Sequence, residues 1–230
     1  MEFWQSFVPR AAPPRAWTTT YDAPMPDGSA LRLPLRDLGE TAVAGFVANQ
    51  ASFGVVRRLS AWMTELARTF GAEVVVGLPT LGQVFAPAVA EALGHPNWVA
   101  PGWSRKRWYE ERLSVNAASI TSPVERRLWL DPRLLPRLVG RRVLLVDDVV
   151  STGGSARAGL ALLAAAGVTP VALLVAMIQG DRWATDWPHD IPLRAVFATP
   201  LFARADDGWV PAPGSARHDL CPLMPKDIAA

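Results

Sequence analysis

One stretch of this 230-residue chain decides its fold: Val143-Leu144-Leu145-Val146-Asp147-Asp148-Val149-Val150-Ser151-Thr152-Gly153-Gly154-Ser155. Its first four residues are aliphatic and partly β-branched, which is typical of a buried strand. The acids, hydroxyl residues and glycines that follow predict a turn from Asp147 to Ser155. The apolar positions from about residue 156 to 166 predict a helix that ends at Gly167. The stretch therefore predicts a strand, a polar turn and a helix in succession.

The same order of elements occurs earlier in the chain. Residues 73–78 predict a strand, residues 79–83 a turn, and residues 84–93 a helix closed by Gly94. Residues 171–178 predict a further strand and residues 98–100 a short one. From about Thr41 to Phe70, apolar residues recur at helical spacing, and Gly71 stands where this helix would stop. Strands that alternate with helices predict the α/β class, with a Rossmann-like open, mainly parallel sheet flanked by helices.

Proline divides the chain into three regions. Residues 1–40 are rich in proline, predict loops and short strands, and are a candidate for a small variable hood over the core. Residues 41–180 form the predicted core. Residues 181–230 are again rich in proline and are expected to wrap the surface or to add an edge element.

Composition excludes several classes of protein. Half of the residues are hydrophobic, 19% are charged and the formal net charge is +2, which indicates a globular domain and not a disordered chain. The single cysteine, Cys221, cannot form an internal disulfide, and no Cys/His cluster has the spacing of a zinc site. The N-terminus lacks the features of a signal peptide, and the longest nearly apolar stretch is too short to span a bilayer. We therefore expect a cytoplasmic protein with no membrane partner, and the arginines interspersed with acids make nucleic-acid binding unlikely.

The turn after the strand has the chemistry of a binding site. Ligands of open parallel sheets bind beyond the carboxyl ends of the strands, where Asp147 and Asp148 are expected. Adjacent carboxylates accept hydrogen bonds from sugar hydroxyls or hold the water shell of Mg²⁺. The glycines and the start of the next helix offer backbone N–H groups to an anion. The stretch thus predicts one ligand that carries both a ribose and a phosphate.

This string resembles the phosphoribosyl diphosphate (PRPP) signature of the type I phosphoribosyltransferases, and the resemblance extends over about residues 40–178. It implies that Asp147 and Asp148 hold the ribose hydroxyls and act in catalysis, and that they hold Mg²⁺ through water. It also implies that the following loop binds the 5-phosphate. The residues assigned to PRPP in this way are Asp147, Asp148, Val150, Ser151, Thr152, Gly153, Gly154 and Ser155.

Two further segments are similar to parts of the same family. The turn after the earlier strand lies where the family keeps its diphosphate loop, which here consists of Pro79, Thr80, Leu81 and Gly82. Residues 103–107 resemble the base of the mobile catalytic loop in the adenine phosphoribosyltransferases. The resemblance implies that Arg105 and Lys106 neutralise the charge of the leaving diphosphate. Enzymes of this family often do so across the interface of a homodimer, which is therefore the expected assembly.

The sequence departs from the adenine enzymes where the base would bind. Those enzymes typically carry a Lys-Leu-Pro-Gly-Glu-like run in the loop, whereas residues 107–113 differ here and leave Glu110 or Glu111 as candidates for the loop acid. The base pocket is usually built by the hood. The aromatic residues there are candidates for stacking on a base, although packing within the hood is the more ordinary role; they are Phe3, Trp4, Trp17 and Tyr21.

The expected function is Mg²⁺-dependent transfer of a phosphoribosyl group from PRPP to a nitrogen of a nucleobase, with release of diphosphate. Adenine is the first acceptor to consider, which implies a role in purine salvage. Two alternatives stay open: a PRPP-binding regulatory protein without transferase activity, and a transferase with a pyrimidine or unknown acceptor. The chain lacks the lysine of a Walker-type phosphate loop and the G-x-G-x-x-G dinucleotide fingerprint, which excludes the ordinary kinase and dehydrogenase sites.

Overall fold

Four parallel strands form the centre of the protein, in the order β10-β9-β8-β5. The computed structural model describes residues 5–119 and 122–225. The four strands are β5 (Val74–Gly77), β8 (Val143–Val150), β9 (Ala172–Gln179) and β10 (Leu193–Thr199). Every residue of β5 and β9 is buried, and so is every residue of β8 except Val149. This burial explains why the strands are continuous aliphatic runs and not alternating ones.

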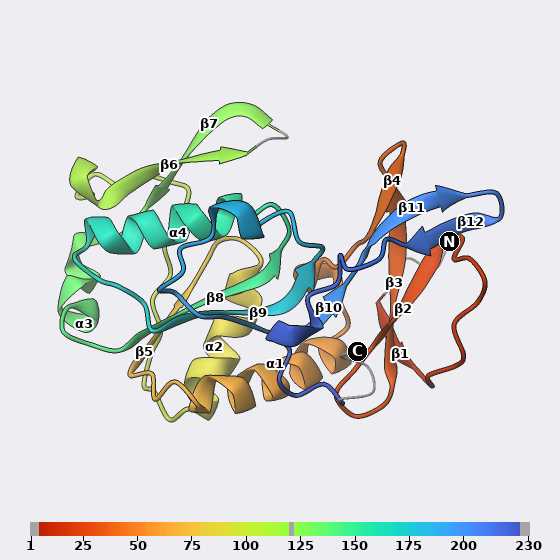
Figure 1. Ribbon diagram of the computed structural model, residues 1–230. Coiled ribbons are helices and arrows are strands. Elements are labelled where there is room, and N and C mark those ends of the chain that lie inside the picture. The colour runs from red at the N-terminus through yellow and green to blue at the C-terminus, as the bar shows by residue number, and fades with distance from the viewer. Residues whose placement is uncertain (1–4, 120–121, 226–230) are drawn as a thin grey trace.

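Helices cover both faces of this parallel sheet (Figure 1). Helices α1 (Phe53–Arg68) and α2 (Gly82–Ala92) pack on one face, and α4 (Gly154–Ala165) packs on the other. The short helix α3 (Leu135–Leu138) precedes β8. A Cβ atom added at Gly77 would lie 2.5 Å from the Cβ of Ala86, so glycine is what lets α2 approach β5. The structure confirms the predicted α/β class and its covered parallel sheet.

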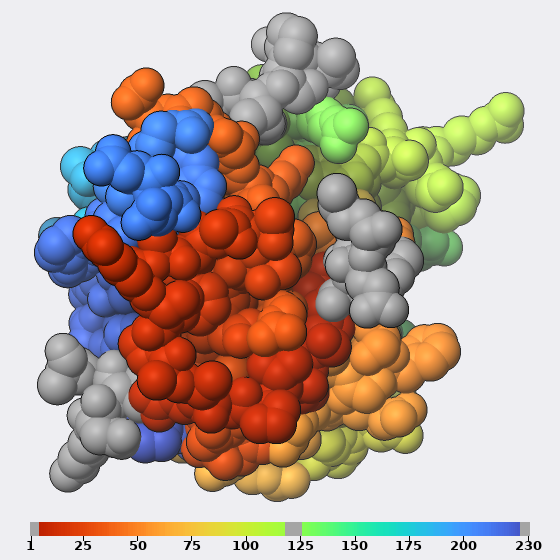
Figure 2. All heavy atoms as spheres, turned by 90° about the vertical axis from the view of Figure 1, so that its right-hand side faces the viewer, coloured from red at the N-terminus to blue at the C-terminus, as the bar shows by residue number. Residues whose placement is uncertain are grey.

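A second sheet, called the hood sheet below, contains six strands that pair only antiparallel. Its strands come from residues 6–44 and from residues 201–211, and the two groups join where β4 pairs with β11. Figure 2 shows the N-terminal residues in red and the C-terminal hairpin in blue side by side on one face of the molecule. The strands are β1 (Ser6–Val8), β2 (Thr20–Pro24), β3 (Ala30–Asp37), β4 (Thr41–Ala44), β11 (Leu201–Ala205) and β12 (Gly208–Pro211).

A two-stranded hairpin projects from the core above α4 (Figure 1). Its strands are β6 (Ser114–Ser119) and β7 (Ser122–Trp129), which pair antiparallel. At the base of the hairpin, the backbones of Gly102 and Trp129 exchange two hydrogen bonds, of 3.0 and 2.8 Å. These bonds anchor the hairpin, and with it the preceding segment that contains Arg105.

Three of the predictions differ from the structure. The region from Thr41 does not begin a helix: residues 41–44 are strand β4, because β3 and β11 pair with them. Helix α1 begins only at Phe53, after Ser52, whose hydroxyl accepts a hydrogen bond of 3.3 Å from the N–H of Val55. Residues 98–100 form only a single parallel bridge to β5. Strand β8 continues through both acids to residue 150, where a turn was expected.

Residues 193–211 contribute strands to both sheets. Strand β10 extends the parallel sheet at its edge, and the hairpin of β11 and β12 belongs to the hood sheet. The limits at residues 40 and 180 stay a prediction, and the hood sheet includes β4 from just beyond the first of them. Within the described ranges, no helix is both long and apolar enough to cross a membrane.

The junction between the two sheets predicts a large difference between two phenylalanines. Phe197 of β10 is fully buried and packs edge-on against Phe46, with the ring centroids 6.5 Å apart. We expect Phe197→Ala to lower the free energy of unfolding by about 3–5 kcal/mol. The control Phe53→Ala removes a side chain that is 82% exposed and should change it by less than about 0.5 kcal/mol. Urea denaturation measures both, and equal losses would contradict the placement of the core.

Candidate functional site

Two adjacent carboxylates lie at the end of β8 inside the protein. Asp147 is 5% exposed and Asp148 is 7% exposed. The N–H of Asp148 donates a hydrogen bond of 2.9 Å to Oδ1 of Asp147. Neither acid forms an ion pair with any arginine, lysine or histidine in residues 5–119 and 122–225. The pair is therefore buried with no protein cation in these ranges to neutralise an ionised carboxylate.

Burial sets the ionisation of this pair. It raises the pKa of Asp147 well above its ordinary value, and the charge of Asp148 raises it further. Burial also raises the pKa of Asp148, to about 6, although hydrogen bonds from Asp147 and from backbone N–H groups oppose the shift. Strongly shifted carboxyl groups at the edge of a parallel sheet are typical of a functional site.

The turn between β5 and α2 lies directly against the acid pair. A Cβ atom added at Gly82 would lie 2.6 Å from the carbonyl oxygen of Val146 and 2.8 Å from the Cα of Asp147. The N–H of Gly82 donates a hydrogen bond to Asp147, which favours the ionised acid. The Pro79–Thr80 peptide of this turn is cis. Two segments that lie far apart in the sequence, residues 79–82 and the acid pair, thus come together, and only glycine fits at their contact.

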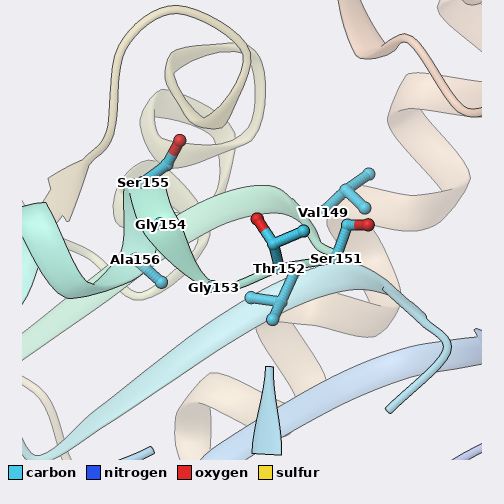
Figure 3. Close-up of a pocket in the computed structure, with 8 residues that line it drawn as sticks. Val149, Ser151, Thr152, Gly153, Gly154, Ser155 and Ala156 are labelled. Atoms are coloured by element: carbon cyan, nitrogen blue, oxygen red, sulfur yellow. The ribbon is translucent and has the colours of Figure 1, made fainter. Parts of the chain in front are cut away.

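The loop after the acids forms a pocket at the start of α4, lined by residues 149–156. Gly153 caps the helix in a left-handed conformation, with φ of 79°. The hydroxyls of Thr152 and Ser155 point to the same side of the loop, whereas that of Ser151 points away (Figure 3). A helix N-terminus with free N–H groups and two hydroxyls on one side can bind a phosphate.

The Ser151 hydroxyl is occupied by bonds within the protein. It donates a hydrogen bond of 2.6 Å to Oε1 of Gln179 and accepts one of 2.9 Å from Nη2 of Arg182. Nε2 of Gln179, which is buried, donates a bond of 2.7 Å to the carbonyl oxygen of Ala44 in β4. The sequence interpretation missed Gln179 and Arg182. Their signal was a polar residue at the carboxyl end of β9, the strand beside β8.

The predicted loop cations lie outside the phosphate pocket. Arg105 and Lys106 are exposed and do not line it. Nη1 of Arg105 lies 3.4 Å from Oε2 of Glu111, and its guanidinium lies 5.1 Å from the centroid of the Trp129 ring. Both candidate loop acids are engaged in ion pairs in the same region: Glu111 also pairs with Arg127, and Glu110 pairs with Arg112 at 2.7 Å.

The hood aromatics pack against each other. Tyr21 is buried between Trp17 and Phe202, with ring centroids 5.1 and 5.0 Å away, and burial raises its pKa to about 12. The burial of Tyr21 agrees with packing within the hood, the more ordinary role expected for it, and leaves little of its ring accessible to a base. The other two aromatic candidates, Phe3 and Trp4, lie outside the described residues.

Comparison with known proteins gives a consistent result. The model of the family named phosphoribosyl transferase domain matches residues 43–197. Over 161 residues, the chain is 34% identical to adenine phosphoribosyltransferase from Frankia casuarinae, covering 64% of this chain and 78% of the relative. It is 30% identical to the enzyme of that name from Frankia alni, with coverages of 64% and 77%.

Solved structures of similar fold carry the same name. The adenine phosphoribosyltransferase of Saccharomyces cerevisiae, crystallised with adenine and an imino-altritol bisphosphate, is 20% identical and covers 64% of this chain and 81% of its own, with a TM-score of 0.52. The enzyme from Rhodothermus marinus has the same identity, coverage and TM-score. At this identity, the likeness concerns the fold.

The acid pair predicts an unusual dependence of stability on pH. The folded-state pKa of Asp148, about 6, exceeds the unfolded value of about 3.9, so the folded protein retains a proton that the unfolded chain has lost. The resulting stabilisation is fully present below about pH 4 and is lost as the pH rises through 6. The change in the free energy of unfolding caused by Asp148→Asn is measured at pH 4 and at pH 7.5. We expect this change to be more stabilising at pH 7.5, by about 2–3 kcal/mol.

Denaturant titration of wild type and variant at both pH values measures this difference. Asp207→Asn, on the exposed turn between β11 and β12, is the matched control and should show no such difference. An effect of Asp148→Asn on the free energy of unfolding that is equal at pH 7.5 and at pH 4 would contradict the unneutralised burial of this acid.

Proposed function

Because this chain belongs to the phosphoribosyl transferase domain family, we propose that it transfers the phosphoribosyl group of PRPP to adenine and releases diphosphate. One observation carries the proposal: the buried acid pair is followed directly by a phosphate-binding loop at the N-terminus of α4. That arrangement suits a ligand with ribose hydroxyls and a phosphate monoester. The names of the most similar relatives support adenine as the acceptor.

The roles of the PRPP-binding residues follow from their surroundings. Asp147 and Asp148 accept hydrogen bonds from the ribose hydroxyls. The N–H groups of residues 151–155, with the hydroxyls of Thr152 and Ser155, bind the 5-phosphate. The turn of residues 79–82 binds the diphosphate with its N–H groups at the start of α2, close to the acid pair. The two helix N-termini thus hold the two charged ends of one substrate.

The acid pair also fits Mg²⁺. Its oxygen donors are the type that Mg²⁺ prefers, and no protein cation in the described ranges neutralises them. No group of three or more candidate metal-binding side chains occurs among the described residues, so water and substrate oxygens would supply the other ligands. Asp147 and Asp148 would therefore hold the ion through water. When bound, Mg²⁺ supplies positive charge to the diphosphate.

Catalysis in this proposal is mainly orientation and charge stabilisation. A nitrogen of adenine forms a bond to C1 of the ribose and its proton is released to water, while the bond from C1 to the diphosphate oxygen breaks and its electron pair leaves with the diphosphate. Arg105 and Lys106 stabilise that charge after the loop closes. Closure requires Arg105 to leave Glu111, and an exposed ion pair of this kind contributes only about 0–1 kcal/mol. We further propose a homodimer that acts in purine salvage in the cytoplasm.

The first test is diphosphate release from PRPP and Mg²⁺ in the presence of adenine, guanine, hypoxanthine, xanthine, orotate or uracil, with a control lacking base. We expect release with adenine and its loss in Asp148→Asn, which removes a charge that holds the ribose and the metal. If PRPP raises the melting temperature but no base is consumed, the transferase proposal fails and a PRPP-binding regulatory protein replaces it. Release only with orotate or uracil would make the acceptor a pyrimidine.

The loop cations provide a second test. We expect Arg105→Ala to lower kcat about 10²- to 10³-fold, because preorganised charges at a leaving group have effects of this size. Arg107→Ala removes an equal charge from the same exposed segment and should retain nearly the wild-type kcat. Steady-state kinetics with adenine measures both. Equal losses in the two variants would show that only the net charge of the segment matters.

A further inference from the structure

Two arginines that the sequence interpretation did not assign lie against the phosphate loop. Nη2 of Arg182, which follows β9, donates a hydrogen bond of 2.9 Å to the hydroxyl of Ser151. Arg157 lies one turn into α4, and its side chain covers Gly153: a Cβ atom added there would lie 2.7 Å from its Nη1 and 3.5 Å from its Cζ. The loop is thus approached by guanidinium groups from two separate elements.

Neither guanidinium forms an ion pair in the described part of the chain. Of the 21 arginines in the chain, all of them in the described ranges, ten pair with carboxylates, and Arg157 and Arg182 are among the eleven that do not. Their charge is therefore not neutralised by protein acids. Two such charges beside a loop of N–H groups create a local field that attracts an anion.

A chain of hydrogen bonds that begins at the buried Gln179 holds the Arg182 side chain in place. The Ser151 hydroxyl gives its hydrogen to Gln179, so its oxygen can only accept from Arg182. Gln179 is itself held by the carbonyl oxygen of Ala44. Consequently the Ser151 hydroxyl cannot donate to a phosphate in this arrangement. Neither Arg182 nor Arg157 lines the pocket of residues 149–156, and Arg182 is bonded on the side to which the Ser151 hydroxyl points. The other N–H groups of Arg182 therefore reach a phosphate there only when its guanidinium turns toward Thr152 and Ser155.

The charge of a phosphate monoester favours contact with guanidinium groups such as these. A phosphate monoester carries about −1.5 to −2 charges near pH 7, and a helix N-terminus offers only about half a positive charge. The planar guanidinium has a fork of N–H donors that matches phosphate oxygens. We propose that Arg182 and Arg157 contact the phosphate monoester in the loop and are specificity residues for a dianionic phosphate. The identification of this ligand as the 5-phosphate of PRPP rests on the proposed function.

The test is the binding of ribose 5-phosphate, and of PRPP with Mg²⁺, measured by calorimetry at low salt. We expect Arg182→Ala to weaken the binding of both ligands about 10- to 100-fold, as for the loss of a hydrogen bond between charged groups, and Arg157→Ala to weaken it in the same direction. Arg182→Lys retains the charge without the fork and should fall between wild type and Arg182→Ala. The control is Arg137→Ala in α3. Arg137 is exposed and forms no ion pair in the described ranges, so this variant should bind both ligands like wild type.

Kinetics separates this role from a structural one. In Arg182→Ala we expect the KM for PRPP to rise, while the KM for adenine and the melting temperature of the free protein stay close to wild type. Because Arg182 is exposed, its replacement leaves the core intact. A fall in melting temperature with unchanged ribose 5-phosphate affinity would assign Arg182 a purely structural role and would overturn the inference.

The remaining outcomes distinguish this inference from the proposed function. Arginine-dependent binding of ribose 5-phosphate without transfer to any base would support the inference and overturn the transferase proposal. Turnover of PRPP with affinities unchanged in both arginine variants would support the transferase and overturn the inference. Failure of wild type to bind either phosphate ligand would overturn both.

Discussion

The burial of two adjacent carboxylates at the end of β8 is the constraint on which the site depends. Charged groups out of water are costly unless other groups compensate them. Here the compensation is partial: the N–H of Gly82 reaches Asp147, and the start of α2 lies beside it. The buried acids therefore lower the stability of the folded protein, but their oxygen donors are already in place when a ligand binds. Local costs of this kind are typical of functional sites.

Close backbone contacts make this arrangement possible. Gly77 lets α2 approach β5, Gly82 lets the same helix begin against β8, and Gly153 takes the left-handed conformation that starts α4. Side chains at Gly77 and Gly82 would push apart the elements that carry the acids and the start of α2, and a side chain at Gly153 would strain the left-handed backbone there. The site is therefore a property of the main chain as much as of its functional side chains.

The local patterns of the sequence predicted the parallel sheet, its helices and the positions of the acid pair and the loop, because a buried strand, a polar turn and a helix leave periodic and compositional signals. What could not be predicted depends on contacts between distant segments. Strand β4 has no strong local signal and forms through β3 and β11. Ser151 matches a phosphate-binding hydroxyl in sequence, but Gln179 takes its hydrogen in three dimensions. Tyr21 is an aromatic residue of the type that stacks on bases, yet it is buried against Trp17 and Phe202.

The hood sheet has a consequence for how the chain reaches its native state. Its first four strands precede the parallel core in the chain, whereas β11 and β12 follow all four strands of that core. The edge of β4 therefore stays unpaired while the whole core is being made, and such an edge is prone to pair with other chains. Pairing of the two ends also closes a very long loop, which slows folding. The parallel core can form around β5 and β8 during synthesis, whereas the hood sheet is completed only after all four core strands have been made.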